Sequence, residues 1–504
     1  MLKVLEVNNV DLLGRTFNGY NMINELTDED MSVKQVVIEK QSFCENVIKI
    51  LNDKEMLVCD KLKSFEEKLS IHNLLSITTP TLKHMREYKE ADIIHFHMFH
   101  NTKLSIPSLM DISREKHVVL TLHDPWFLTG RCVHFYDCDK WKIGCNNCKH
   151  LDNLFPFTKD NCNNMWNIKK EVFHNSNIDI VVSSKWMYDN VKSSPIFGEN
   201  VRLHLIPFGI DLDKYKNYNK KAELKEKFGF DKDDVVLFLR AQMEFKGTEY
   251  ILEALEKLKT NKKIGILTCN EIGLFNGMKD KYKVVDLGNI NEDEVIDAMN
   301  ACDIFLMPSK GESFGMMTVE AMACEKPVII FNNTALPSVT FAPECGYLVE
   351  DRNSFELSKA IKKLVDDDKE RIKRGKLGRK YCEEYYDYDN YNSKLKKLYY
   401  EISKVKLKRI NSYNIDESDY ELYLNAITKY LEKDIIDEID YSNPKYLYAI
   451  NKVNDEIYFR VCDGSLKLKI SFIKKIKNIL KKNKIVNSLY FKVKSFVQKS
   501  KKKR

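Results

Sequence analysis

The segment GESFGMMTVEAMACEKPVII, residues 311–330, carries two glutamates, Glu312 and Glu320, on either side of a glycine. The preceding run IFLMPS is typical of a buried strand, and MMTVEAMAC (316–324) of the helix that follows it. Ligands of open α/β sheets bind at the carboxyl ends of strands, and the first N–H groups of a helix favour an anion. We therefore expect a phosphate cradle here. Its N–H groups belong to Ser313, Phe314, Gly315 and Met316.

Two carboxylates beside such a cradle suit a nucleotide sugar, which has hydroxyl groups on both sides of its diphosphate. The alternative is that Glu312 and Glu320 are solvated charges at a helix end, because glutamate is usually exposed. The Phe314-Gly315 pair between them favours the ligand-binding interpretation.

Two cations, Arg240 and Lys246, stand in LRAQMEFKG at the end of another predicted strand. Arginine contacts phosphate through two nitrogens and lysine adds a compact charge, so both can stabilise a departing diphosphate. They can also be ordinary surface cations of a lysine-rich chain. Their place at a strand end favours the phosphate-binding role.

Further candidates lie on the other half of the chain. His123, in TLHDPW, follows a predicted strand and can donate a hydrogen bond to a sugar or orient an acceptor hydroxyl, although a structural histidine is the usual alternative. Gly14 and Arg15 lie in a loop where a strand turns into a helix, so the backbone can approach a ligand and a cation can face it. His95 and His97 share one strand face and are expected at most to line the cleft.

Four of the thirteen cysteines cluster in TGRCVHFYDCDKWKIGCNNC, at spacings of six, seven and three. They are Cys132, Cys138, Cys145 and Cys148. Four thiolates can close a tetrahedral zinc site, but only the last pair has a familiar zinc spacing. A structural zinc site and four reduced loop cysteines therefore both stay open. The remaining cysteines are scattered through apolar segments, which favours reduced thiols.

Apolar runs alternate with helical patterns along most of the chain, which indicates parallel sheets with crossover helices. In the first half, after VLEV, the runs are 91–97, 117–123, 178–184 and 201–207. In the second half they are 234–240, 263–269, 283–288, 302–309 and 326–331. We expect two α/β units that face a cleft, joined near IPFGIDLDKY, where a proline and a glycine interrupt the pattern.

The bulk properties narrow the class of protein. A chain of 504 residues is long enough for roughly three domains. Its start, MLKVLEVNNV, lacks the apolar core of a signal peptide, and no window approaches the ~20 apolar residues of a spanning helix. These features predict a cytoplasmic protein.

Charge is concentrated at the C-terminus. Residues 466–504 hold fourteen lysines and one arginine without an acidic residue, so the formal net charge of +7 leaves the rest of the chain at 7 − 15 = −8. Apolar residues recur in this tail at helical spacing, which predicts a basic amphipathic helix for an anionic membrane surface. Docking of this tail on the rest of the same chain, which is acidic, ranks second. Nucleic acid ranks third, because phosphate binding does not need an apolar stripe, and we expect no nucleic-acid partner.

Three motifs together resemble the family 4 retaining nucleotide-sugar glycosyltransferases. ESFGMMTVE resembles their E-x7-E signature, R-x5-KG their diphosphate-binding pair, and IPFGID their interdomain motif. Leu239, where a glycine often precedes the arginine, and Phe208, in place of the usual asparagine, depart from the pattern without removing a charge. The resemblance covers roughly residues 1–400 and implies a GT-B fold of two Rossmann-like domains.

The resemblance also implies roles. Glu312 would contact hydroxyls of the donor sugar and Glu320 the ribose, while the backbone of 286–290 would lie near the base. Arg240 and Lys246 would hold the diphosphate, with the loop of Gly14 and Arg15 beside it. The reaction would retain the anomeric configuration and need no catalytic metal.

The resemblance suggests a division of the chain. We expect an acceptor-side domain over 1–205, a nucleotide-sugar donor domain over 206–385, and a helix over 386–404 that returns to the first domain. The chain then continues with an extension of unassigned role over 405–465 and ends with the basic amphipathic tail over 466–504.

The block HDPWFLTGRC…C…KWKIGC..C, with SSKWMYDNVKSS further on, resembles the colanic-acid-type branch of bacterial surface-polysaccharide glycosyltransferases. That resemblance implies a hexosyltransferase-type enzyme that takes a UDP- or GDP-sugar and extends a glycan or lipid-linked glycan for lipopolysaccharide or exopolysaccharide. With the basic tail, it implies a peripheral protein on the inner face of the cell membrane. The alternative is a non-catalytic, membrane-associated scaffold that kept the fold.

Overall fold

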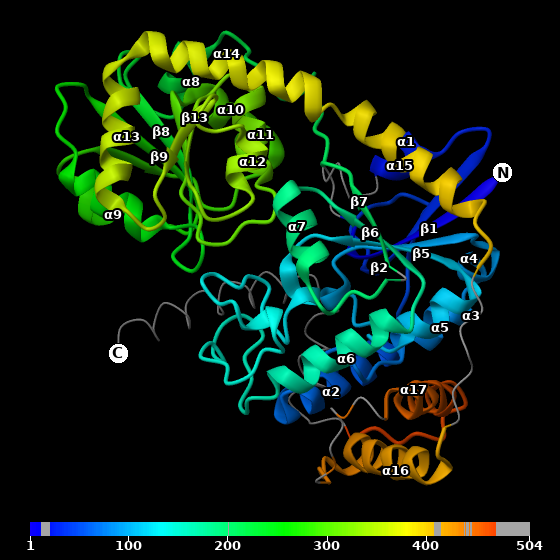
Figure 1. The fold of residues 1–504 in the computed structure, drawn as a ribbon. Coiled ribbons are helices and arrows are strands. Elements are labelled where there is room, and N and C mark those ends of the chain that lie inside the picture. Colours follow the sequence, from blue (N-terminus) through cyan, green and yellow to red (C-terminus); the bar gives the residue numbers. More distant parts are fainter. Residues whose placement is uncertain are drawn as a thin grey trace, which may run out of the picture.

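The computed structural model contains two α/β units side by side, each built on an all-parallel sheet (Figure 1). It describes residues 1–11, 21–199, 201–407, 415–437, 439, 443 and 446–469. The expected loop with Gly14 and Arg15 and almost all of the basic tail lie outside the described residues. The expected fold class of two Rossmann-like units is confirmed, and helices are present toward the C-terminal end, although the helical basic extension expected over 466–504 lies almost entirely outside the described residues.

The first sheet has seven strands in the order β3-β2-β1-β4-β5-β6-β7. They are β1 (Leu2–Val10), β2 (Met31–Glu39), β3 (Val47–Lys49), β4 (Ile93–Phe96), β5 (His117–Leu122), β6 (Ile178–Val182) and β7 (Arg202–Leu205). The helices of this unit are α1 (Asn21–Leu26), α2 (Asp53–Leu69), α3 (Thr78–His84), α4 (Arg86–Glu90), α5 (Ser108–Glu115), α6 (Cys162–His174) and α7 (Lys185–Ser193). Successive residues of its central strands enter different apolar cores on opposite faces, so these strands are mostly apolar, with Glu6 on β1 and His95 on β4 among the buried polar exceptions.

The second sheet has six strands in the order β10-β9-β8-β11-β12-β13. They are β8 (Val235–Ala241), β9 (Ile264–Asn270), β10 (Lys283–Asp286), β11 (Ile304–Met307), β12 (Val328–Phe331) and β13 (Gly346–Val349). Its helices are α8 (Lys221–Lys227), α9 (Thr248–Lys257), α10 (Glu292–Ala301), α11 (Met316–Ala323), α12 (Leu336–Thr340), α13 (Ser354–Asp366) and α14 (Asp368–Tyr385). One face of the sheet packs on α9 and α13, and the other on α10 and α11.

Each sheet has a point where the strand order reverses. In the first sheet it lies between the neighbours β1 and β4, and in the second between β8 and β11, where Leu239 pairs with Leu306. Connections leave such a pair toward opposite faces, which opens a crevice at the carboxyl ends of the strands. The fold alone therefore marks one ligand-binding position in each unit.

The chain crosses between the units twice, and the two crossings lie together. Ile210 N donates a 2.9 Å hydrogen bond to Tyr386 O, and Ile210 also forms a parallel bridge with Asp387. After the second crossing, α15 (Tyr388–Ser403) returns to the first unit (Figure 1). There Tyr399 Oη lies 2.6 Å from Nδ1 of His95 on β4.

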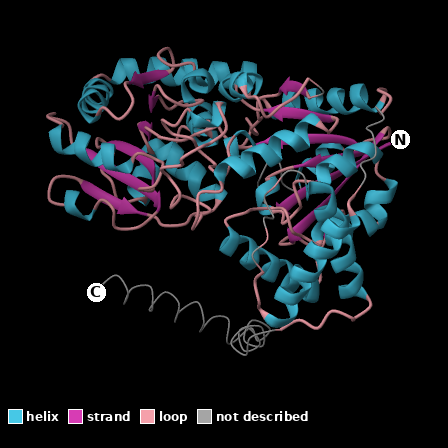
Figure 2. Ribbon diagram, turned by 60° about the horizontal axis from the view of Figure 1, so that its bottom comes forward, coloured by secondary structure: helices cyan, strands magenta, loops and turns pink. Residues whose placement is uncertain are grey.

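Two C-terminal helices, α16 (Glu417–Lys433) and α17 (Leu447–Cys462), pack on α2 and α3 of the first unit. Lys61 on α2 donates to Leu431 O at 2.7 Å and pairs with Asp434 at 2.7 Å. Asn454 on α17 accepts a 3.0 Å hydrogen bond from Ser76 N. Figure 1 labels α16 and α17 beside the first unit, away from the second, and Figure 2 shows the helices and strands of both units from another side. Within the part of the chain that the structure describes, no helix is long and apolar enough to span a membrane.

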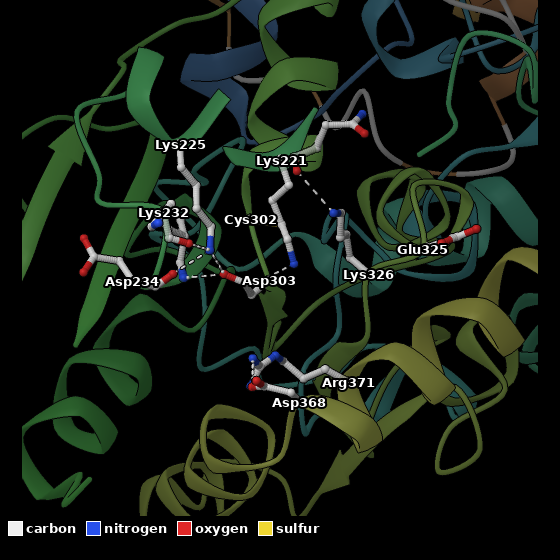
Figure 3. A network of polar contacts seen from close by, with 12 residues as sticks. Lys221, Lys225, Lys232, Asp234, Cys302, Asp303, Glu325, Lys326, Asp368 and Arg371 are labelled. Carbon is white, nitrogen blue, oxygen red and sulfur yellow. Dashed lines mark hydrogen bonds and ion pairs between the residues drawn. The ribbon is translucent and has the colours of Figure 1, made fainter. Parts of the chain in front are cut away.

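A network of charges around the buried Asp303 holds the amino end of β11 (Figure 3). Asp303 pairs with Lys221 at 2.9 Å and with Lys225 at 2.7 Å. Burial raises the pKa of Asp303, but the two lysines outweigh that effect and hold the pKa below its ordinary value. Because this network lies at the opposite end of β11 from the crevice, we assign it to the stability of the second unit.

Candidate active site

Lys246 and Glu312 form an ion pair at the carboxyl ends of β8 and β11. Lys246 Nζ lies 2.8 Å from Oε1 and 3.1 Å from Oε2 of Glu312, and only 9% and 14% of the two side chains are exposed. The turn that delivers Lys246 is tight: Gly247 has a φ of 69°, and a Cβ there would lie 1.9 Å from Pro308 O. Glycine at position 247 thus lets the lysine approach the end of β11.

The segment predicted to cradle a phosphate leads directly into α11. Ser313, Phe314 and Gly315 lead into the helix, whose first residue is Met316, and the first N–H groups of a helix have no partner within it. The loop is fixed from the first unit, because Ser184 Oγ donates a 2.6 Å hydrogen bond to Ser313 O. Within the described residues, the buried Oγ of Ser313 has no hydrogen-bond partner.

Arg240 and Glu320 lie near each other beside this cradle. Arg240 is exposed, and its Nη2 is 3.5 Å from Oδ1 of Asn270. Burial, with a smaller contribution from Glu292, raises the pKa of Glu320 to about 7, while the charge of Arg240 opposes the shift. Glu320 therefore changes charge close to neutral pH, next to a cation that favours its ionised form.

The side chain of Phe208 connects His123 to this site. Its ring stacks on Phe208 at a centroid distance of 5.4 Å, and Phe208 meets Phe314 edge-on at 5.2 Å. Nε2 of His123 also lies 3.0 Å from Nδ1 of His97. His95 and His97 do not line an open cleft as expected, because both are fully buried.

His134 is a residue of this site that the sequence analysis missed. Its ring lies 5.1 Å from that of Phe245, and a Cβ at Gly311 would be 2.6 Å from its Cγ. Burial lowers the pKa of His134, as does Lys246, while Glu312 and Asp124 act in the opposite direction. A loop of the first unit thus places an imidazole against the Lys246–Glu312 pair. In the sequence, the signal that could have indicated a role for His134 was its place inside the cysteine-rich segment.

The structure brings the predicted donor-side residues together and keeps the cysteines apart from them. At the carboxyl ends of β8 and β11 lie Arg240, Lys246, Glu312, Ser313, Phe314, Gly315, Met316 and Glu320, with His123 behind Phe208. Gly14 and Arg15 lie outside the described residues. Cys132, Cys138, Cys145 and Cys148 instead line a separate cavity in the first unit.

One set of described residues has the spacing of metal ligands: Glu6, His95 and His97 offer atoms within 4.8 Å of one another. Both ring nitrogens of His95 are already used, by Tyr399 Oη at 2.6 Å and Thr121 Oγ1 at 2.7 Å. Burial raises the pKa of Glu6 to about 8, against hydrogen bonds from Gln35 and Tyr399 that lower it. These residues fit a neutral hydrogen-bonded network better than a metal site.

Comparison with known proteins agrees with this geometry. A family model described as glycosyl transferases group 1 matches residues 220–381. The putative colanic acid biosynthesis glycosyl transferase WcaC of Escherichia coli K12 is 24% identical over 49% of this chain and 61% of its own length. A D-inositol 3-phosphate glycosyltransferase of Xylanimonas cellulosilytica is 25% identical over 34% of this chain and 45% of its own. The chain thus spans about half the length of such curated relatives.

Solved structures match a larger part of the chain. Anabaena HepE in complex with UDP-glucose has a TM-score of 0.55 at 14% identity and covers 80% of this chain and 100% of its own. WaaG, a glycosyltransferase of lipopolysaccharide biosynthesis, has a TM-score of 0.55 at 14% identity, over 78% of this chain and 99% of its own. At this identity the likeness establishes the two-domain GT-B fold.

Proposed function

Because residues 220–381 belong to the group 1 glycosyl transferases and lie within a GT-B fold, we propose that this chain is a retaining, hexosyltransferase-type glycosyltransferase. It moves a sugar from a UDP- or GDP-sugar to a glycan or lipid-linked glycan during lipopolysaccharide or exopolysaccharide synthesis. The observation that carries the proposal is the buried Lys246–Glu312 pair beside the start of α11, at the strand-order reversal of the second sheet. The complex of HepE with UDP-glucose supports the donor class, and the roles of WcaC in colanic acid and of WaaG in lipopolysaccharide biosynthesis support the acceptor class.

On the donor side, each role follows from charge and position. The N–H groups from Ser313 to Met316 and the cations Arg240 and Lys246 bind the diphosphate. Glu312 accepts hydrogen bonds from hydroxyls of the sugar, and Glu320 from those of the ribose. The two carboxylates thereby fix both ends of the donor around the phosphate site.

On the acceptor side, His123 orients the attacking hydroxyl or donates a hydrogen bond to the sugar. The acceptor oxygen bonds to the anomeric carbon on the face from which the diphosphate departs, so the configuration is retained. The hydroxyl proton passes to the departing phosphate oxygen. Arg240 and Lys246 stabilise the negative charge that develops there. No step requires a catalytic metal.

The protein is proposed to act at the inner face of the cell membrane. Residues 466–504 hold fifteen cations and no acidic residue, so this segment attracts an anionic surface, at ~1 kcal/mol for each cation near the surface. A chain that ends at Gly464 is expected to lose binding to anionic vesicles. Vesicle binding that equals that of the full chain contradicts the membrane role.

The test of the donor site is a thermal-shift titration of the purified chain with nucleotide sugars and free nucleotides. A ligand at 100 times its Kd stabilises the folded state by about 2.7 kcal/mol, so a donor gives a clear and selective shift. Lys246→Ala should abolish the shift. Lys61→Ala, which breaks an ion pair far from the cleft, should retain it.

The donor found in this way is then used in a transfer assay, in which NMR of the product gives the anomeric configuration. Inversion contradicts the retaining mechanism. If the folded protein shows no shift with any nucleotide, the enzyme proposal fails and the non-catalytic scaffold takes its place.

A further inference from the structure

The cysteine-rich loop after β5 gathers five thiols around one cavity. Cys132, Cys138, Cys145 and Cys148 line it together with Cys162, the first residue of α6. The free volume at its centre is about 20 Å³, room for one small occupant. All five thiols are free in the structure.

Two buried cations stand next to this cavity without a carboxylate partner. Arg131 and Lys169 are 1% and 0% exposed, and in the part of the chain that the structure describes neither forms a salt bridge. Lys169 donates to the carbonyls of Trp126 at 2.6 Å and Thr129 at 2.8 Å. Arg131 donates to the carbonyls of His150, Asn153, Leu154 and Phe155. Buried charges are normally paired, so Arg131 lacks a counter-charge, and burial lowers the pKa of Lys169 to about 7, against the raising effects of the nearby cysteines and Asp124.

We propose that Cys132, Cys138, Cys145 and Cys148 bind a zinc ion that fixes this loop. One Zn²⁺ with four thiolates carries a net charge of 2−, which balances the two buried cations. Donors already point at the sulfurs: Gly130 N lies 3.2 Å from Cys145 Sγ, and Arg131 Nη1 lies 4.0 Å from Cys132 Sγ. Each thiol releases its proton to solvent as the zinc–sulfur bond forms.

The shape of the loop supports a structural role. Between β5 and α6 the described chain contains only short 3-10 turns, Pro125–Leu128 and Lys140–Lys142. A connection of that length without regular structure is uncommon in a compact domain, and a metal can replace the missing core. In tetrahedral zinc sites the Zn–S distance is about 2.3 Å, so the four sulfurs must close toward one another around the ion. Among the described residues, only Glu6, His95 and His97 already place three ligand atoms within 4.8 Å of one another.

Cys162 is assigned outside the ligand set. It packs against Cys148 as a buried thiol and therefore serves as a matched control within the same cavity. Glu6, His95 and His97 provide the competing location for a metal. The experiment must distinguish a metal held by the four proposed cysteines from one that uses Cys162 and from one held by Glu6, His95 and His97.

The test measures metal in the full chain purified without chelators. Elemental analysis should find about one zinc per chain, and X-ray absorption should find four sulfur neighbours at about 2.3 Å. Cys145→Ser and Cys148→Ser should lose most of the zinc, while Cys162→Ser and His97→Gln should retain it. Replacement by cobalt(II) should give the sulfur-to-metal charge-transfer band and the d–d bands of a tetrahedral thiolate site.

Several results overturn the proposal. The proposal fails if the folded wild-type protein takes up neither zinc nor cobalt. It also fails if zinc is lost in His97→Gln but kept in Cys145→Ser. If the cysteine variants do not fold, the wild-type X-ray absorption spectrum decides the question. A first shell of nitrogen or oxygen excludes the four-cysteine site.

Discussion

Phe208 lies between His123 of the first unit and Phe314 of the second, stacked on the former and edge-on to the latter. It belongs to the first of the two crossings between the units and is 4% exposed. The family pattern commonly has an asparagine at this position, so the chain has replaced a polar side chain with an apolar contact. One ring thereby couples His123 of the first unit to the loop before α11 of the second.

We expect Phe208→Ala to weaken that coupling. Phenylalanine-to-alanine changes in a core typically cost about 3–5 kcal/mol, and loss of the stack also frees His123. Urea denaturation should show the loss of stability, and turnover should fall by a larger factor than in Phe208→Leu, which keeps apolar volume. Equal turnover in the two variants would contradict a role for the ring in positioning His123.

Glu312→Gln tests the carboxylate of the central ion pair. The amide keeps the shape but loses the charge that accepts hydroxyl hydrogen bonds and pairs with Lys246, so turnover should fall by roughly 10²–10³-fold, as for other lost electrostatic contacts in active sites. The melting temperature should change little. Glu417→Gln, which breaks the 2.8 Å pair with Lys452 on the C-terminal helices, is the matched control. Unchanged kcat/KM in Glu312→Gln would remove the proposed site.

His134→Asn tests the contact from the cysteine-rich loop. Because His134 lies against the Lys246–Glu312 pair, its loss should raise KM for the donor by about tenfold, the effect of ~1.4 kcal/mol. Zinc content and melting temperature should match those of the wild type. A variant that loses zinc or stability together with activity would indicate a purely structural histidine.

Glu6→Gln tests the buried carboxyl under α15. The folded-state pKa of about 8 lies above the ordinary glutamate value of about 4.3, so the folded protein holds a proton that the unfolded chain releases. The resulting stability is complete below the unfolded pKa and is lost as the pH rises toward the folded one. Gln cannot ionise, so the variant should lose less stability than the wild type between about pH 5 and pH 8, by at least ~1 kcal/mol.

Urea denaturation at several pH values measures this difference. Glu67→Gln, at an exposed position on α2, should follow the wild-type pH profile. Parallel profiles for Glu6→Gln and the wild type would mean that Glu6 stays ionised in the folded protein.

Most of the fold follows from patterns in the sequence. Long apolar runs predicted β8, β9 and β11 correctly, because strands buried on both faces are apolar throughout. The helix expected over 316–324 is found as α11, Met316–Ala323. The strands β2, β3 and β13 were not predicted: polar residues interrupt MSVKQVVIE, and the other two strands are three and four residues long.

The site was only partly predictable. Strand ends and helix starts are local features, so the grouping of Lys246, Glu312 and Glu320 could be expected from sequence. His134 comes from a loop of the other unit, and its approach to Gly311 depends on how the two units pack. The helices α16 and α17 were missed for a related reason: their apolar faces are matched to α2 and α3, and short-range patterns do not reveal that partner.

The pairing of residue 210 with residues 386 and 387 determines how the two halves can move. Two adjacent crossings act as a double-stranded hinge, which bends about one axis and resists twisting. The cleft can then open and close, while the lateral alignment of the acceptor face with the donor face is kept. A single proteolytic cut in the second crossing would leave the two sheets covalently joined through the first crossing, yet it would remove this directional constraint.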